Sequence, residues 1–156
     1  MTGTAVFSFT PSTADADREW AAQLMAASEP WITLGRRLEQ CRVACGRPEF
    51  RLVIARMAAE RCAFALVNPR GLAGSPYLAS IAVAPAWRSR GVGAALLEFC
   101  EQRAAPARHF FLCVSSFNVR AQVFYERHGY RQVGEFSDYI IDGASEHLMH
   151  KRLDRS

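Results

Sequence analysis

The chain has 156 residues, of which 50% are hydrophobic and 22% charged, and its formal net charge is +4. These values are typical of a globular protein, and we expect a single domain over residues 1–156. No apolar run approaches the roughly 20 residues of a membrane span, and residues 1–17 lack the basic and apolar regions of a secretory signal. We therefore expect a cytoplasmic protein with no membrane partner.

The basic residues and the cysteines exclude two further classes of partner. Lys151 is the only lysine, and the arginines are spread along the chain without a basic run, so the composition does not favour nucleic-acid binding. The five cysteines form an odd set with no Cys-x-x-Cys pair, which indicates reduced thiols and not a disulfide or zinc framework. We expect no nucleic-acid partner and no metal.

Local patterns in the first half of the chain predict both strands and helices. The expected elements are a strand over 4–9, a helix over 14–27, a helix from about 33 to 46, a hairpin of strands 50–57 and 61–67, and a turn-rich loop over 68–76. Pro11 should end the first strand, and Ser12 or Thr13 should cap the helix that follows. Glycine, proline and asparagine in 68–76 are the residues that favour turns.

The second half predicts strands that alternate with helices. The expected elements are a strand over 77–84, a helix from 93 to about 105, a strand over 109–114, a helix that follows Asn118, and final strands over 130–135 and 146–153. The strand over 77–84 is more uniformly apolar than the others, so it should lie at the centre of the sheet. Asn118 should be the N-cap of its helix, and Gly129 should follow the C-terminus.

A basic, glycine-containing turn, Arg-Ser-Arg-Gly-Val-Gly over residues 88–93, joins the central strand to the next helix. Backbone N–H groups and the positive end of a helix dipole converge at such a turn, so it predicts a phosphate site. A Rossmann fingerprint would need its third glycine at Leu96, and a Walker A loop would need Gly-Lys-Ser/Thr. The pattern that remains is a short pyrophosphate-binding loop.

Two motifs, spread over residues 77–135, resemble those of a known superfamily. Residues 81–85, Ile-Ala-Val-Ala-Pro, precede an Arg-x-x-Gly-x-Gly turn, and Asn118 is followed seven residues later by Tyr125. In both motifs and in their order the sequence resembles the GNAT superfamily of acyl-CoA-dependent N-acyltransferases. The resemblance implies an α/β (mixed α+β) fold with a mostly antiparallel, splayed sheet of about seven strands and about four flanking helices.

The resemblance also implies acetyl-CoA as co-substrate. Backbone amides of the turn, with Arg88 and Arg90, would hold the pyrophosphate, and the edge of the central strand would pair with the pantetheine amides. An N–H near Val83 would polarise the thioester carbonyl. Asn118 would bind the cofactor or only cap its helix. The implied cofactor-binding residues are Ile81, Ala82, Val83, Arg88, Ser89, Arg90, Gly91, Val92, Gly93, Ala94 and Asn118.

Tyr125 is the implied catalytic residue, since its hydroxyl would protonate the departing thiolate, although it could instead be a core tyrosine. A glutamate of peptide-acetylating relatives is replaced here by Cys113, and a thiol is a poor base. Water or a carboxylate could take its place, and three carboxylates are suitably located: Glu29, Asp138 and Glu146, any of which could be a plain surface charge. The expected acceptor-site residues are Glu29, Trp31, Asp138 and Tyr139.

The sequence as a whole favours an N-acetyltransferase that moves an acetyl group from acetyl-CoA to a primary amine by direct attack in a ternary complex. The amine could belong to a small molecule or to a peptide. The sequence is also compatible with a homodimer. The alternative is an acyl-CoA-binding sensor or interaction module without efficient turnover. Cys113 favours this alternative, whereas Tyr125 argues against it.

Overall fold

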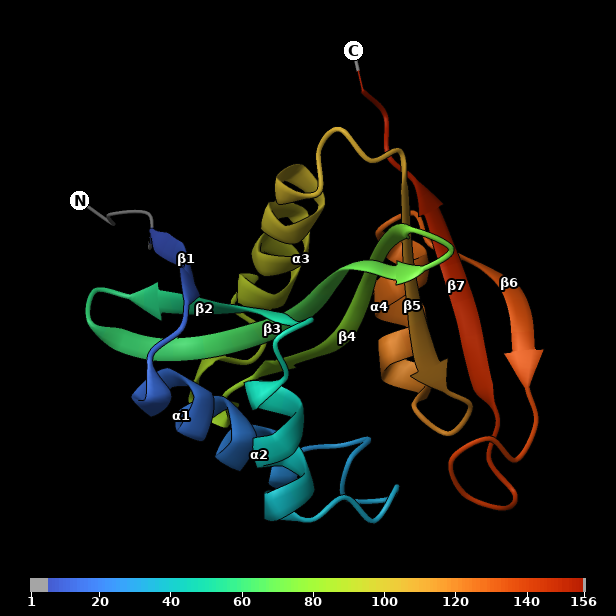
Figure 1. Ribbon diagram of the computed structural model, residues 1–156, viewed down its shortest axis with the longest axis horizontal. Helices are drawn as coiled ribbons and strands as arrows, with labels where there is room; N and C mark the ends of the chain where they lie inside the picture. The colour runs from blue at the N-terminus through green and yellow to red at the C-terminus, as the bar shows by residue number, and fades with distance from the viewer. Residues whose placement is uncertain (1–5, 156) are drawn as a thin grey trace.

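The computed structural model describes residues 6–155, which form seven strands and four α-helices around one sheet (Figure 1). The elements in chain order are β1 (Phe7–Ser12), α1 (Asp15–Ala26), α2 (Leu38–Gly46), β2 (Arg51–Met57), β3 (Glu60–Leu72), β4 (Ser75–Val83), the 3-10 turn η1 (Pro85–Trp87), α3 (Val92–Arg103), β5 (His109–Ser115), α4 (Val119–Arg127), β6 (Arg131–Phe136) and β7 (Glu146–Arg152). No helix in this part of the chain is long and apolar enough to cross a membrane.

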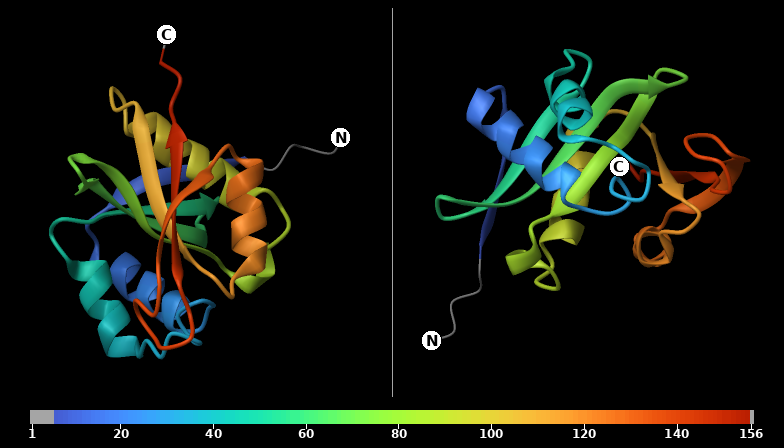
Figure 2. Two further views of the ribbon diagram at one scale, coloured as in Figure 1. Left: turned by 90° about the vertical axis from the view of Figure 1, so that its right-hand side faces the viewer. Right: turned by 90° about the horizontal axis from the view of Figure 1, so that it is seen from below.

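The strands are ordered β1-β2-β3-β4-β5-β7-β6, and every neighbouring pair is antiparallel except β4 and β5. Helices α1 and α2 cover one face of the β1–β4 half of the sheet, and α3 covers the other (Figures 1 and 2). Helix α4 covers β5 and β7 on the same face as α3. The predicted mixed α/β fold, with about seven mostly antiparallel strands and about four helices, is confirmed.

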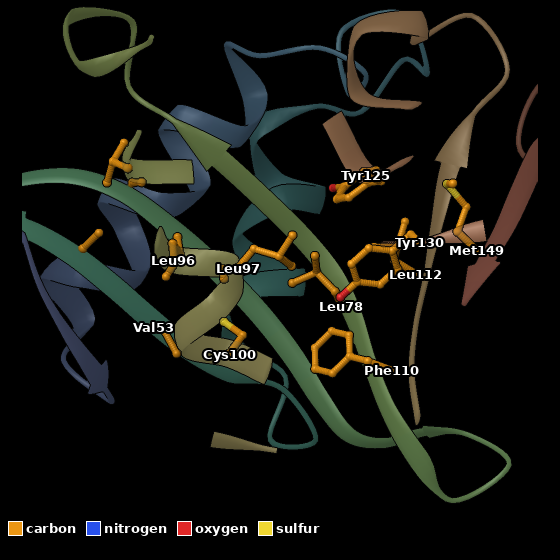
Figure 3. Close-up of a cluster of buried hydrophobic side chains, with 14 of the residues drawn as sticks. Val53, Leu78, Leu96, Leu97, Cys100, Phe110, Leu112, Tyr125, Tyr130 and Met149 are labelled. Atoms are coloured by element: carbon orange, nitrogen blue, oxygen red, sulfur yellow. The ribbon is translucent and has the colours of Figure 1, made fainter. Parts of the chain in front are cut away.

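Two apolar clusters hold the helices against the sheet. Because side chains alternate along a strand, β2 and β3 contribute to both clusters, and each fully buried aliphatic side chain stabilises the fold by roughly 1.5–3 kcal/mol. The first cluster, beneath α3 and α4, includes Val53, Ala65, Leu78, Leu96, Leu97, Phe110, Leu112, Tyr125 and Tyr130 (Figure 3). The second, beneath α1 and α2, includes Ala21, Ala22, Met25, Cys41, Ile54, Phe64 and Leu66.

A β-bulge at Ala79 changes the course of β4. Leu78 is paired with Val67 and Ser80 with Leu66, so Ala79 is an extra residue on the β4 side of the ladder. A bulge of this kind bends the strand and increases its twist. It also reverses the side-chain alternation, because Leu78 belongs to the first cluster and Ala82 to the second.

Beyond the bulge, β4 separates from β5. The two strands are paired only at Tyr77–Phe111 and Leu78–Leu112. The backbone of residues 79–83 therefore has no strand partner on its β5 side within the described chain, and Figure 3 shows β4 and β5 diverging. The predicted central position of this strand is correct, but several of its side chains are only half-buried because a neighbour is missing at this end.

The beginning of the chain differs from its prediction in two ways. Strand β1 runs through Pro11 to Ser12; the missing N–H of Pro11 is tolerated because β1 is an edge strand. Residues 4 and 5 of the predicted strand lie outside the described residues. The predicted cap is also wrong: the N-cap of α1 is Ala14, which has no side-chain cap, and the Ser12 hydroxyl accepts a hydrogen bond from the Ala14 N–H.

Two other predicted boundaries are wrong. The helix expected from about residue 33 begins only at Leu38, because residues 29–35 form turns that are held in part by Glu29, whose carboxylate accepts bonds from the Thr33 N–H and hydroxyl. The predicted loop over 68–76 is mostly strand. The asparagine and proline of this segment do not end β3. They lie where the register between β3 and β4 becomes irregular, between Asn68 and Leu72, and proline is tolerated at such a bulge.

A buried carboxylate ties α1 to the sheet. Asp17 is 5% exposed, and its Oδ1 accepts hydrogen bonds from Arg56 Nη2 and Arg61 Nε, each at 2.7 Å. Its Oδ2 accepts a bond from the Ser12 hydroxyl. Burial by itself would raise the pKa of Asp17, but the bonds from Ser12, Arg61 and Arg56 together lower it from 3.8 to about 2. The ionised carboxylate is therefore part of the folded structure.

The Asp17→Asn variant should lose about 2 kcal/mol of unfolding free energy near neutral pH, since one pKa unit corresponds to about 1.4 kcal/mol. The folded-state pKa lies below the unfolded one, so this stabilisation is complete above about pH 4 and is lost as the pH falls towards about 2. The difference between wild type and variant, measured by urea unfolding, should shrink over that range. A difference that stays constant would contradict the assignment.

Candidate active site

The turn between β4 and α3 presents its backbone to solvent. Gly91, the N-cap of α3, has φ +82° and no side-chain cap, and Ser89 also has a positive φ, +62°. The first N–H groups of a helix have no partner within the helix, so those of residues 92–94 are available to a ligand. All residues from Arg88 to Gly91 are exposed. The turn thus has the open, partly left-handed backbone and the helix start that an anion site requires.

The two arginines of this turn are anchored differently. Arg88 Nε donates a hydrogen bond to the carbonyl of Val83, 3.2 Å away. The Arg90 guanidinium lies over the ring of Trp87, 5.1 Å from its centroid, which is a cation–π distance. Both charges therefore stay beside the start of α3, where they favour an anionic ligand.

A pocket of about 410 Å³ lies beside this helix start. Its lining residues come from α3, from the end of α4 and from β7: Gly91, Ala94, Ala95, Leu97, Glu98, Glu101, His128 and Lys151. Glu101 is held by Lys151 Nζ and by the Tyr130 hydroxyl, each at 2.8 Å. The structure thus brings two predicted cofactor residues, Gly91 and Ala94, to a preformed cavity of a size that binds small ligands.

The other predicted strand residues lie on two faces of β4. Ile81 and Val83 are half-buried against the first cluster, whereas Ala82 is buried in the second. Their backbone lies in the stretch of residues 79–83 that is paired with β3 but not with β5, so the amide groups of alternate residues there face the opening between β4 and β5. A ligand with amide groups could pair there as an added strand would.

Helix α4 places Tyr125 at this opening. Asn118 is its N-cap, as predicted, and Asn118 Oδ1 accepts a bond from the Ala121 N–H at 3.4 Å. Gln122 Nε2 donates to the carbonyls of Ser115 and Ser116, at 3.1 and 2.9 Å, and so fixes α4 to the end of β5. Gly129, with φ +92°, follows the helix end as expected.

The Tyr125 side chain is 7% exposed and packs edge-on against Tyr130, with ring centroids 5.8 Å apart. Figure 3 shows it between the diverging strands, with the hydroxyl on the β4 side. Burial alone raises the pKa of Tyr125, so it is protonated at neutral pH. No fully enclosed polar side-chain atom in residues 6–155 lacks a hydrogen-bond partner. The Tyr125 hydroxyl has none there, so its oxygen is not fully enclosed and keeps some exposure to solvent.

The predicted acceptor-site residues lie on two loops, 28–37 and 137–145. Glu29 bonds to Thr33 within its own loop, and Asp138 Oδ1 accepts a bond from the Gly143 N–H at 2.6 Å. Trp31 is half-buried against the second cluster. Tyr139 is 67% exposed and its ring lies tilted against that of Phe136, so it is not a core aromatic. Glu29 and Asp138 thus shape their loops.

The structure also brings together four residues that the sequence does not connect: Tyr77, Cys113, Ser115 and Glu146, termed here the Tyr77–Glu146 cluster. Phe110, Leu112 and Val114 of β5 face the first cluster, so Cys113 and Ser115 lie on the opposite face. Ser115 is paired with Glu146, and Tyr77 with Phe111, which places them on that face too. Alternation within β5 is visible in the sequence, but the register between strands is not.

Tyr77 in this cluster lies close against the backbone of Gly71. A Cβ on Gly71 would lie 2.6 Å from Tyr77 Cβ, so only glycine fits there. Burial and the neighbouring Cys113 thiol raise the pKa of Tyr77, and Glu146 and Tyr139 are close enough to contribute. The loop that carries Tyr139 therefore lies near this face of the opening.

Comparison with known proteins places this arrangement in a family. The acetyltransferase (GNAT) domain profile matches residues 48–132. A GNAT-family protein from Desulfovibrio desulfuricans superposes with a TM-score of 0.80 at 18% identity, covering 96% of this chain and 100% of that one. The ribosomal-protein-S18-alanine N-acetyltransferase of Escherichia coli gives 0.74 at 17% identity, covering 97% and 96%.

A third solved structure contains the cofactor. It is a candidate streptothricin acetyltransferase from Bacillus anthracis in complex with acetyl coenzyme A, with a TM-score of 0.63 and 20% identity over 72% of this chain and 67% of that one. No curated protein matches the sequence. These structural likenesses establish the fold, and the matched domain spans more than half of the residues. The chain therefore belongs to the GNAT family of acetyltransferases.

Proposed function

We propose that this protein transfers an acetyl group from acetyl-CoA to a primary amine of a small molecule or peptide, by direct attack in a ternary complex. One observation carries the proposal: the opening between β4 and β5 lies beside an uncapped helix start, and the Tyr125 hydroxyl reaches it. This geometry provides a place for a pyrophosphate, an extended amide chain and a thioester in succession. The acetyl coenzyme A bound by the B. anthracis protein supports the choice of ligand.

The donor would be held mainly by backbone groups. The N–H groups from residue 88 to 94 would bind the pyrophosphate, with Arg88 and Arg90 adding positive charge, and Asn118 either contacts the cofactor or serves only as the cap of α4. The unpaired edge of residues 79–83 would pair with the pantetheine amides. An N–H near Val83 would then donate to the thioester carbonyl as negative charge develops on its oxygen.

The reaction needs one proton to leave the amine and one to reach the sulfur. The amine nitrogen attacks the thioester carbon, a C–N bond forms and the C–S bond breaks. Tyr125 keeps its proton at neutral pH, so its hydroxyl can donate to the sulfur as the thiolate departs. The products are an N-acetyl amide and the free thiol of coenzyme A.

The reaction class is tested by incubating the protein with acetyl-CoA and a panel of amines, including peptides with free N-termini, and trapping the thiol that is released. Thiol release that depends on the amine, together with the acetylated product seen by mass spectrometry, is the expected result. Binding of acetyl-CoA without release above hydrolysis would instead favour the sensor or interaction module.

Replacement of Tyr125 by Phe removes only the hydroxyl. We expect kcat to fall by about 100-fold, in the range for loss of a general acid, with little change in the dissociation constant of acetyl-CoA. Tyr130→Phe is the matched control: it removes another buried hydroxyl, which bonds Glu101, and should cost about 1 kcal/mol of stability without a comparable loss of kcat. Equal loss of kcat in both variants would mean that Tyr125 is a core residue.

Substitution of Gly91 by Ala tests the turn. A side chain at φ +82° costs about 1–2 kcal/mol, and nothing lies within 4 Å of the new Cβ, so the effect acts through the backbone alone. Gly74 in the β3–β4 turn has φ +79° and equally open surroundings, which makes Gly74→Ala a matched control. Both variants should lose similar stability, but only Gly91→Ala should weaken coenzyme A binding in calorimetry, by about tenfold.

A further inference from the structure

We propose that Glu146 is the base that takes the proton from the acceptor amine. The inference rests on the proposed acetyl transfer, which needs a proton acceptor on the side of the opening that the acceptor uses. Glu146 is the first residue of β7, directly beside Ser115 on β5, and it belongs to the Tyr77–Glu146 cluster. This cluster lies on the sheet face opposite the first apolar cluster, and therefore opposite Tyr125.

The environment of Glu146 is unusual for a carboxylate. The residue is 6% exposed, and its Oε2 accepts a hydrogen bond from the Ser115 hydroxyl at 2.6 Å. It makes no ion pair with any basic residue between 6 and 155, although a buried carboxylate is costly unless it is paired or hydrogen-bonded. A carboxyl group buried here without a cationic partner contributes little to stability, which favours a chemical role for Glu146.

The second carboxylate oxygen of Glu146 is accessible. Ser115 is the only hydrogen-bond donor to this side chain within the described chain, and no fully enclosed polar side-chain atom there lacks a partner. Oε1 therefore keeps some exposure to solvent and can receive a proton, while Oε2 is held in place by Ser115.

Groups on three sides set the proton affinity of Glu146. Burial raises its pKa, and the Ser115 hydrogen bond and the nearby His147 oppose this rise. Tyr77 and Cys113 face it from β4 and β5, and Tyr139 lies beyond Tyr77. A carboxylate with a raised pKa is a stronger base than an exposed one.

The other acidic and thiol groups on this side are less suitable. Burial first, and then the charge of Glu146, raise the pKa of Cys113, so its thiol is protonated and cannot act as the base. The Glu29 carboxylate bonds to Thr33, and that of Asp138 bonds to the backbone of Gly143. Both side chains are exposed. Of these carboxylates only Glu146 is buried, and it lies beside Ser115 at the end of β5, the strand that separates from β4.

In the proposed step, the nitrogen of the amine forms the C–N bond, and its proton moves to Oε1 of Glu146. The electron pair of the C–S bond remains on sulfur, which receives the proton of Tyr125. After release of the products, Tyr125 regains a proton and Glu146 loses one to solvent. The protons therefore balance over the cycle without another reactant.

The test compares Glu146→Gln with Glu135→Gln. Glu135 belongs to the same β6–β7 hairpin, but its carboxylate pairs with His147 on the sheet face opposite Glu146. We expect kcat of Glu146→Gln to fall by about 100-fold, with unchanged acetyl-CoA affinity and melting temperature, and Glu146→Asp to recover part of it. Glu135→Gln should keep the wild-type kcat. A Glu146→Gln enzyme that folds, binds acetyl-CoA and retains wild-type kcat would overturn the inference and leave the acetyl transfer intact.

A second variant separates catalysis from structure. Ser115→Ala removes the hydrogen bond that lowers the pKa of Glu146, so the acidic limb of the kcat profile should move to higher pH while the plateau is kept. An acidic limb that does not move would contradict the role of Glu146. Failure of the wild type to acetylate any amine would overturn the proposed function itself, and this inference with it.

Discussion

The bulge at Ala79 is the feature on which the site depends. A regular β4 would continue its parallel pairing with β5 and leave no free backbone at the centre of the sheet. One extra residue ends that pairing after Leu78 and exposes the edge of residues 79–83. The cost of the unpaired amides is tolerable because α3, α4 and the rest of β5–β7 remain fixed by the two apolar clusters.

The sequence predicted the parts of the site that follow from local rules. Gly91 is needed for a left-handed turn, Asn118 for a helix cap, and their order along the chain indicated the family. The uniformly apolar character of residues 77–84 also gave the central position of β4. Such features depend on the conformation of a few neighbouring residues, which composition and spacing reveal.

Features that depend on strand register could not be predicted in this way. Glu146 looks like one of three surface carboxylates until β7 is aligned with β5, which buries it beside Ser115. The bulge at Ala79 cannot be recognised in the apolar sequence of residues 77–84, because it is defined only by the pairing with β3. Likewise, the turn residues in 68–76 indicate a loop when read locally, although pairing with β4 extends β3 to Leu72.

The opening between β4 and β5 connects the two faces of the sheet, and each face presents a different set of residues to it. The helix start and the pocket of Gly91 and Ala94 lie on the α3 side, whereas Tyr77, Cys113 and Glu146 lie on the opposite side. In the proposed reaction, the donor and the acceptor would approach from these two sides and meet only at the gap. Neither would then have to pass the other, so each could arrive or leave while its partner is still bound.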